Sequence, residues 1–108
     1  MNEGSNVETR DERLKFEWDE RKNQLNIKKH NISFEEAETV FQDANAVYVY
    51  DEQNSIDEDR FNVIGLIDSI NHEIVVCHCY RGDNDNIIRI ISARKANQTE
   101  VRLYREGL

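Results

Sequence analysis

Three polar residues, Arg89, Ser92 and Arg94, interrupt the apolar run IIRIISAR at positions 87–94. The run is typical of a β-strand, whose side chains alternate between two faces. Arg89 is therefore expected on one face, and Ser92 and Arg94 on the other. A charged side chain in such a run is costly unless a carboxylate pairs with it or it lines a groove. These residues are candidates either for structural ion pairs or for binding an anion such as phosphate.

Two further arginines extend this set, because Arg60 and Arg81 stand at the ends of predicted strands. Strand ends on one sheet can converge on one site. The planar guanidinium of arginine suits two phosphate oxygens at once. The alternative for Arg89 is neutralisation of a carboxylate such as Asp83 or Glu73.

A second candidate binding surface lies on a helix predicted over residues 19–30. Positions i, i+4, i+7 and i+8 of this helix form a continuous strip, which holds Lys22, Asn26, Lys29 and His30. The strip runs beside the line of Trp18 and Leu25. Two cations next to an aromatic ring suit a phosphate clamp with a stacked base. The alternative is a solvated helix face with a core tryptophan at its start.

Other chemistries find little support in the sequence. It contains no G-x-x-x-x-G-K-[ST], G-x-G-x-x-G or H-E-x-x-H motif, so no nucleotide cradle or zincin site is predicted. Cys77 and Cys79 share a strand face, which favours core thiols in a reducing compartment over a disulfide or zinc site. His72 and His78 are typical of buried sheet histidines, and Cys77 and His78 point apart. We expect neither a metal nor a cofactor.

The formal net charge of −8 at pH 7 opposes a nucleic-acid partner, because phosphate binding normally leaves a basic footprint. Residues 1–20 hold three basic and seven acidic side chains, and residues 43–59 hold six acidic and none basic. The rest of the chain therefore carries +2, which leaves room for a basic site. The acidic segments are either solvated or attract a basic partner protein.

The helices that must position these residues follow from capping signals. Asp19 caps the first helix, which is expected to end near residue 30. Ser33 and Glu36 form an S-x-x-E capping box that begins a second helix with apolar residues at helical spacing to residue 41. Asn97, followed by Glu100, caps a final helix, on which Val101, Tyr104 and Leu108 lie near one face.

The strands follow from a change of period. Residues 14–18 alternate as a short strand, and four further strands are expected in AVYVY, RFNVIGLI, EIVVCHCY and IIRIISA. The order β-α-α-β-β-β-β-α predicts an α+β fold, with helices packed on one side of an antiparallel sheet. Residues 1–13 are predicted to be a disordered acidic leader, and residues 14–108 one domain. No apolar stretch suits a membrane span or an export signal, so we expect a cytoplasmic protein.

Four separated strings in this chain resemble the BrnT family of toxins. They are F-E-W-D-x-x-K-x-x-x-N-x-x-K-H from Phe16, I-S-F-E-E-A from Ile32, D-R-F-x-x-I-G from Asp59 and R-I-I-S-A-R-K-A from Arg89. The match covers residues 14–106 in the family's order. The resemblance implies a RelE-like fold and an endoribonuclease that arrests growth by cutting RNA. It also implies inhibition by a BrnA-type antitoxin with a ribbon-helix-helix domain, through which the complex binds operator DNA and represses its own operon.

Two positions depart from the family pattern. The glycine that often follows the K-H pair is Asn31 here, which is compatible with a left-handed helix cap. The usual H-T-x-R string reads His78, Cys79, Tyr80 and Arg81, so the hydroxyl group is replaced by a thiol.

The implied RNA cleavage is best served by attack of the 2′-hydroxyl on the adjacent phosphate, which leaves a 2′,3′-cyclic phosphate. In this hypothesis Arg60, Arg89 and Arg94 stabilise the transition-state charge. Ser92 orients the phosphate or a neighbouring side chain. The candidate substrate-binding residues are Trp18, Lys22, Lys29, His30 and Arg81.

The general base is open between Glu58, His30 and a lysine activated by neighbouring arginines. A second hypothesis is that the protein is a binding module, weak as a catalyst, which acts with its antitoxin as an operon co-repressor.

Overall fold

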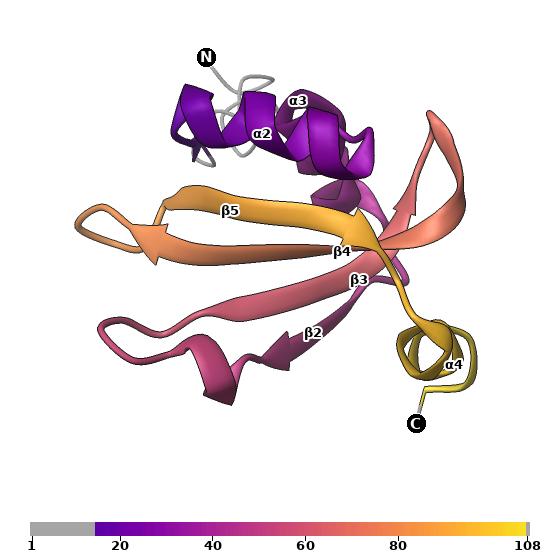
Figure 1. Ribbon diagram of the computed structural model, residues 1–108. Coiled ribbons are helices and arrows are strands. Elements are labelled where there is room, and N and C mark those ends of the chain that lie inside the picture. The colour runs from indigo at the N-terminus through magenta and orange to yellow at the C-terminus, as the bar shows by residue number, and fades with distance from the viewer. Residues whose placement is uncertain (1–14, 108) are drawn as a thin grey trace, which may run out of the picture.

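The computed structural model describes residues 15–107, so the predicted leader and Leu108 lie outside the described residues. One sheet has the strand order β1-β5-β4-β3-β2. Its strands are β1 (Lys15–Glu17), β2 (Val47–Tyr50), β3 (Phe61–Ile67), β4 (Ile70–Arg81) and β5 (Ile87–Lys95) (Figure 1). The helices are α2 (Glu20–His30), α3 (Phe34–Ala37) and α4 (Gln98–Glu106), and the 3₁₀ turns are η1 (Glu38–Gln42) and η2 (Glu52–Asn54).

Helix α2 begins and ends where its capping residues predict. The Asp19 carboxylate accepts hydrogen bonds from the backbone N–H groups of Arg21 and Lys22. At the other end Asn31 adopts the left-handed conformation, with φ of 59°, and donates its N–H to the carbonyl of Ile27. The residue that replaces the family's glycine therefore fills the same conformational role.

The second helix is shorter than its periodicity predicts. The Ser33–Glu36 capping box is present, but the α-helix ends at Ala37 and continues as the 3₁₀ turn η1. This turn presses Val40 onto β3 at Gly65, where an added Cβ would come within 2.8 Å of the Val40 Cγ2 atom. Glycine is required there by the close approach of the two elements.

Two buried amides fix α2 to its neighbours. The Asn26 side chain donates to the carbonyls of Ile32 and Ala93 and accepts from the Ala93 N–H. The Asn23 Oδ1 atom accepts from the Phe34 N–H at the start of α3. Each buried backbone group left unsatisfied would cost about 1–3 kcal/mol. Asn26 is therefore a structural residue, and its predicted place on an exposed binding strip was wrong.

The sheet is covered on both faces rather than one. Helices α2, α3 and η1 pack on one face over a core made of Ile32, Phe34, Ala37, Val40, Val63, Ile67, Ile74, Val76, Ile90 and Ala93. On the other face Val101, Leu103 and Tyr104 of α4 pack against Ile64, Val75 and Ala96. Figure 1 shows α2 and α4 on opposite sides of the sheet. Helix α4 goes there because it also has an apolar side, and the first face is already filled.

The sheet also departs from the antiparallel prediction at one edge. Strand β1 pairs with β5 in parallel, whereas the other pairs are antiparallel. The register places Glu17 opposite Arg89. The short first strand therefore brings a carboxylate beside an arginine of the last strand, which is a contact that neither segment predicts alone.

Helix α4 is held to the sheet by a buried carboxylate. The Glu73 side chain is 3% exposed, and one of its oxygens accepts a hydrogen bond from Arg105 Nε at 2.7 Å. The Tyr104 hydroxyl donates to Asp43 at 2.7 Å. The hydrogen bond from Arg105 holds the pKa of Glu73 below its ordinary value of 4.5.

This pair predicts an acid-labile contribution to stability. Because the folded pKa is lower than the unfolded one, the contribution is present above about pH 4.5 and is lost as the pH falls through the folded pKa. Glu73→Gln should lower the free energy of unfolding at pH 7 by about 1–3 kcal/mol, and the gap from wild type should narrow in acid. Urea unfolding from pH 7 to pH 3 measures this, with Glu106→Gln, an exposed change on α4, as the control. A gap that does not change with pH would contradict the assignment.

Candidate active site

A β-bulge in β5 changes which residues share a face. Cys77 lies opposite Ser92, but the next residue, His78, lies opposite Ile90, so Ile91 is an extra residue in the ladder. The predicted alternation assumed a regular strand and placed Arg89 on the face opposite to Ser92 and Arg94. That prediction was wrong, because the bulge resets the phase of the strand between them.

Paired residues on adjacent strands point to the same face of a sheet. Arg89 is opposite Cys79, Ser92 is opposite Cys77, and Arg94 is opposite Val75. Because Val75 packs under α4, all three belong to the face that α2 does not cover. The bulge therefore gathers the candidate residues of β5 on one surface.

Arg60 and Arg81 extend this surface. Arg81 follows Cys79 by two positions on β4, and Arg60 precedes Asn62, which pairs with Cys77. The positive charges of Arg60 and Arg94 both lower the pKa of the Cys77 thiol, against the larger effect of burial, so both side chains lie near it. We call this surface the arginine face. It is made of Arg60, Arg81, Arg89, Arg94, Ser92 and Cys77.

Each arginine of this face has a carboxylate neighbour. Arg94 makes two parallel hydrogen bonds to Glu100 of α4, both of 2.8 Å. Arg89 binds Glu17 at 2.9 Å, which is neither of the partners expected from the sequence. These bonds are the structural ion pairs that the sequence analysis gave as one of two interpretations of Arg89 and Arg94. Because the side chains of Arg89 and Arg94 remain 31% and 41% exposed, they are also open to an external anion.

Glu58 joins the other two arginines. Its carboxylate lies 3.0 Å from the Arg81 guanidinium and 3.6 Å from that of Arg60. Beside it is a cavity of about 280 Å³, lined by Glu58, Asp59, Phe61, Tyr80 and Asp85. The rings of Phe61 and Tyr80 meet edge to face there, with centroids 5.5 Å apart. One carboxylate therefore contacts two guanidinium groups and borders an aromatic cavity.

One donor on this face has no acceptor. The Nε atom of Arg60 is buried and makes no hydrogen bond with the described part of the chain. A buried donor without a partner costs about 1–3 kcal/mol and is uncommon in folded proteins. A phosphate oxygen would satisfy this donor once a movement of the Arg60 side chain exposes it, and the weak 3.6 Å contact with Glu58 leaves Arg60 less firmly held than the other arginines.

The two thiols are unsuited to nucleophilic chemistry. Burial, together with the nearby Asp51 carboxylate, raises the pKa of Cys77 to about 11. Burial is also the largest cause that raises the pKa of Cys79. Both therefore remain protonated at neutral pH. Cys79 is buried as predicted, whereas Cys77 is half-buried on the arginine face.

His78 is buried on the other face, as predicted for a sheet histidine. Its Nδ1 atom lies 3.0 Å from the carbonyl of Val76, and its ring packs edge-on against Phe41 at 4.9 Å. Burial lowers the pKa of His78, so its ring is neutral at pH 7. This histidine belongs to the core and not to the arginine face.

The helix residues predicted to bind substrate lie in a different layer. Trp18 packs edge-on against Phe34 and donates its indole N–H to Glu20. Lys22 and Lys29 are exposed and His30 is half-buried on α2, which covers the opposite face of the sheet. The structure therefore does not bring these four residues together with the arginines, and their role in RNA binding stays a prediction.

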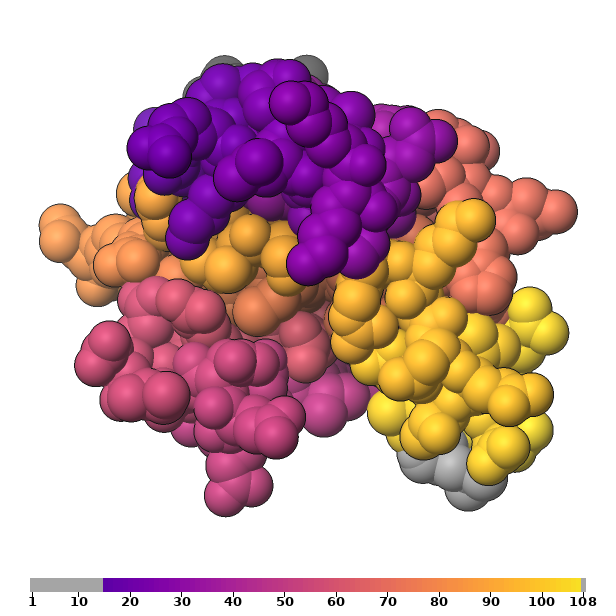
Figure 2. All heavy atoms as spheres, viewed as in Figure 1, coloured from indigo at the N-terminus to yellow at the C-terminus, as the bar shows by residue number. Residues whose placement is uncertain are grey.

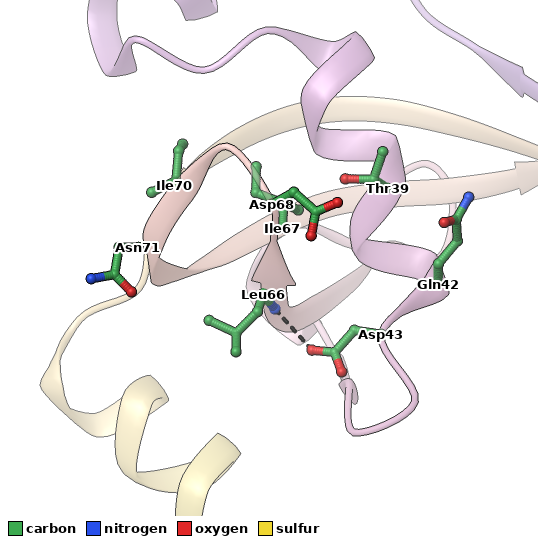
Figure 3. Close-up of a pocket in the computed structure, with 8 residues that line it drawn as sticks. All are labelled: Thr39, Gln42, Asp43, Leu66, Ile67, Asp68, Ile70 and Asn71. Carbon is green, nitrogen blue, oxygen red and sulfur yellow. Dashed lines mark hydrogen bonds between the residues drawn. The ribbon is translucent and has the colours of Figure 1, made fainter.

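A second cavity lies away from these groups. It measures about 500 Å³ and is formed by η1 and the β3–β4 turn (Figure 3). Its carboxylate at Asp43 already accepts from the Leu66 N–H and the Tyr104 hydroxyl. The lining of this cavity contains no arginine, lysine, histidine or cysteine. We therefore place the candidate active site on the arginine face, because its residues can bind a phosphate.

Within residues 15–107, no three His, Cys, Asp or Glu side chains are grouped so that they could hold a metal ion. No helix within this range is long and apolar enough to cross a membrane.

Comparison with known proteins identifies the family. A profile described as "Ribonuclease toxin, BrnT, of type II toxin-antitoxin system" matches residues 18–100, which include all four arginines of the arginine face. The chain belongs to the BrnT family. Among curated proteins, no sequence matches the chain.

A solved BrnT structure supports the same assignment. The 1.1 Å crystal structure of the Brucella abortus ribonuclease toxin BrnT is 28% identical in sequence to this chain. The superposition has a TM-score of 0.60 and covers 79% of this chain and 99% of the Brucella protein. The α+β fold predicted from the order of helices and strands is thus confirmed.

Some features of this BrnT-family site had no signal in the sequence analysis. The carboxylates that contact the arginines, Glu17, Glu58 and Glu100, come from three separate segments. Of these, only Glu58 was predicted to belong to the site. Glu100 was expected solely as a cap residue, and it has both roles, because its Oε1 atom also accepts from the Asn97 N–H.

Proposed function

We propose that this chain is the toxin of a type II toxin–antitoxin system and cleaves RNA on the arginine face without a metal ion. Membership of a family of ribonuclease toxins supports the activity. The observation that carries its location is the gathering of four arginines on one face, where the buried Arg60 Nε donor finds no acceptor among residues 15–107. Such a surface suits a phosphate and, in the transition state, the additional negative charge on it.

The proposed step uses the substrate's own hydroxyl group. The 2′-oxygen forms a bond to phosphorus as the P–O5′ bond breaks, which leaves a 2′,3′-cyclic phosphate and a free 5′-hydroxyl. Glu58 accepts the 2′-hydroxyl proton, and the 5′-oxygen takes a proton from water. We assign this role to Glu58 rather than to His30 because Glu58 lies within 4 Å of Arg60 and Arg81, whereas His30 is on the opposite layer.

The arginines hold the phosphate in this proposal. Arg60 donates its Nε to one non-bridging oxygen, while Arg89 and Arg94 turn from their carboxylates toward the growing charge. Ser92, which is opposite Cys77, orients the phosphate or a neighbouring guanidinium.

We further propose that a BrnA-type antitoxin with a ribbon-helix-helix domain neutralises the toxin. The acidic loop that includes residues 51–59 favours a basic partner, because opposite charge speeds encounter. Operator DNA is then contacted through the antitoxin, which suits a toxin with a net charge of −8.

Replacement of Arg89 and Arg94 by alanine tests the location of the site. The double variant should cleave RNA at least about a hundredfold more slowly, because two charge-stabilising donors are lost. It should also relieve growth arrest. Initial cleavage rates measure this, and circular dichroism shows whether the fold is kept. Arg102→Ala, an exposed arginine of α4, is the matched control.

Two results would count against this assignment. A folded double variant with full activity would remove both residues from the site. An unfolded one would show that the pairs with Glu17 and Glu100 are needed for structure first. A folded variant that loses cleavage but still binds its antitoxin is the result we expect.

A further inference from the structure

No element within residues 15–107 covers the outer edge of strand β2. It pairs on one side with β3, and the strand order leaves its other side at the margin of the sheet. Its side chains are apolar or aromatic, and Tyr48, Val49 and Tyr50 are 51%, 36% and 49% exposed. Soluble proteins usually protect such an edge with a charge, a proline or a bulge. Residues 47–50 contain no charge or proline, and the β2–β3 register has no shift.

Exposed apolar side chains concentrate around this strand. Six large hydrophobic residues of the described chain are exposed, and three of them are on β2. Ile56, 85% exposed, is in the loop that follows, and Leu66 is on the neighbouring strand β3. Only Leu25, on α2, lies elsewhere. Figure 2 shows the segment around residues 50–60, in magenta, at the surface and uncovered by α2 or α4. Such a concentration marks an interaction surface.

The charge beside this edge indicates what kind of partner could bind there. Residues 51–59, which directly follow β2, hold five acidic side chains and no basic one. This acidic loop is tied to the strand, because the Tyr50 hydroxyl donates to Asp59 at 2.9 Å and the Asp51 N–H donates to the carbonyl of Arg60. A second copy of this chain, with its charge of −8, would be repelled there. A basic partner would be attracted.

We propose that β2 is the docking strand for an extended, basic segment of the antitoxin, which adds to the sheet edge by backbone hydrogen bonds. This inference rests on the proposed function, because it names the surface that the antitoxin uses. Strand addition supplies affinity through the main chain, and the exposed side chains of Tyr48, Val49 and Tyr50 supply contacts on both faces.

The position of β2 also links docking to inhibition. The acidic loop runs from β2 directly to Glu58 and Arg60. The Asp51 N–H donates to the Arg60 carbonyl, and the Arg60 N–H donates to the Ser55 hydroxyl, which holds the loop at the residue before β3. A strand bound at β2 therefore lies next to the start of the loop that carries Glu58, the proposed general base. To bind RNA, Glu58 and Arg60 must break their contact with each other. Docking at β2 fixes the loop and limits this movement.

Val49→Lys tests the proposal. A lysine on the edge strand repels a basic segment and opposes strand addition. Binding of the purified BrnA-type antitoxin, measured by titration calorimetry, should weaken at least tenfold. Cleavage of RNA by the variant alone should not fall, because Val49 makes none of the proposed catalytic contacts and the added positive charge lies on the same face of the sheet as the arginines. Two controls should keep wild-type affinity: Val49→Thr, which is β-branched and neutral, and Leu25→Lys, which makes the same charge change on α2.

Hydrogen exchange on the wild-type protein gives a second readout that needs no variant. Backbone amides in residues 47–50 should exchange more slowly in the complex than in the free toxin. Equal affinity of Val49→Lys and wild type, or unchanged exchange over β2, would overturn the proposal. So would a wild-type dimer in light scattering that Val49→Lys dissociates, because the occupant would then be a second copy. A wild-type chain that cleaves no RNA when free of antitoxin would instead overturn the proposed function.

Discussion

Cleavage of RNA by the purified chain is expected to continue in excess EDTA and to stop at any position where the 2′-hydroxyl is replaced by hydrogen. The arginine face provides positive charge from fixed side chains, and no group of metal ligands lies within residues 15–107. A nuclease that depends on two bound cations uses them to stabilise the attacking and leaving oxygens. Here guanidinium groups would do so, and the nucleophile would belong to the substrate.

The measurement uses one short RNA and a series of copies that each carry a single 2′-deoxy position. The change should abolish cleavage at the bond that follows the substituted sugar and leave the other bonds intact. Product ends assigned by mass should carry a 2′,3′-cyclic phosphate or the 3′-phosphate derived from it. The all-DNA copy is the matched control, and it should not be cut.

Two results would overturn this mechanism even for an active toxin. One is loss of activity in EDTA that returns with added magnesium. The other is a product with a 3′-hydroxyl end, which requires water and not the 2′-oxygen as the nucleophile. Either would separate the mechanism from the family membership, which stands on the sequence match.

The sequence predicts local structure well wherever side chains bond to their own backbone. The caps Asp19, Ser33 and Asn97 each accept the backbone hydrogen bonds that their positions predict. These interactions involve residues two or three apart, so they can be recognised in a single segment. The strands over 47–50 and 61–95 follow equally from their alternation.

Long-range arrangement was the part that the sequence could not supply. The parallel pairing of β1 with β5 joins Glu17 to Arg89 across the length of the chain. The bulge at Ile91 depends on how β4 and β5 fit, and nothing in IIRIISAR distinguishes it from a regular strand. One extra residue was enough to move Arg89 to the face of Ser92 and Arg94. Residue types therefore predicted the four arginines and Ser92 as candidates, but not their common side or the place of Cys77 among them.

The carboxylates around the arginines would explain how an acidic chain can carry the phosphate site that we propose. Glu17, Glu58 and Glu100 neutralise the guanidinium groups in the free protein, so these groups do not repel one another before RNA binds. A phosphate would have to displace these carboxylates from the arginines. The transition state, which carries more negative charge than the bound substrate, would displace them more readily. Arg60 differs in part, because its Nε atom has no acceptor within residues 15–107, although its Nη2 atom contacts Glu58.

Glu58→Gln is expected to slow RNA cleavage by about 10²–10⁴-fold, the usual contribution of a general base. Glutamine keeps the size of the side chain and one acceptor oxygen, but it cannot take the proton of the 2′-hydroxyl. Because Glu58 is 30% exposed, the variant should fold, and circular dichroism checks this. Glu52→Gln, an exposed change in the same acidic loop, should leave the rate unchanged and so exclude a general effect of charge.

The leaving group distinguishes a base from an acid in this experiment. A substrate whose bridging 5′-oxygen is replaced by sulfur expels a thiolate, which leaves without a proton. If Glu58 activates the 2′-hydroxyl, the glutamine variant stays slow on this substrate, because the attacking oxygen still needs a base. If Glu58 instead protonates the leaving oxygen, the sulfur substrate restores the rate, and the assignment is reversed. A variant within about threefold of wild type on the ordinary substrate would remove Glu58 from proton transfer, and the base would then have to be sought elsewhere in the chain.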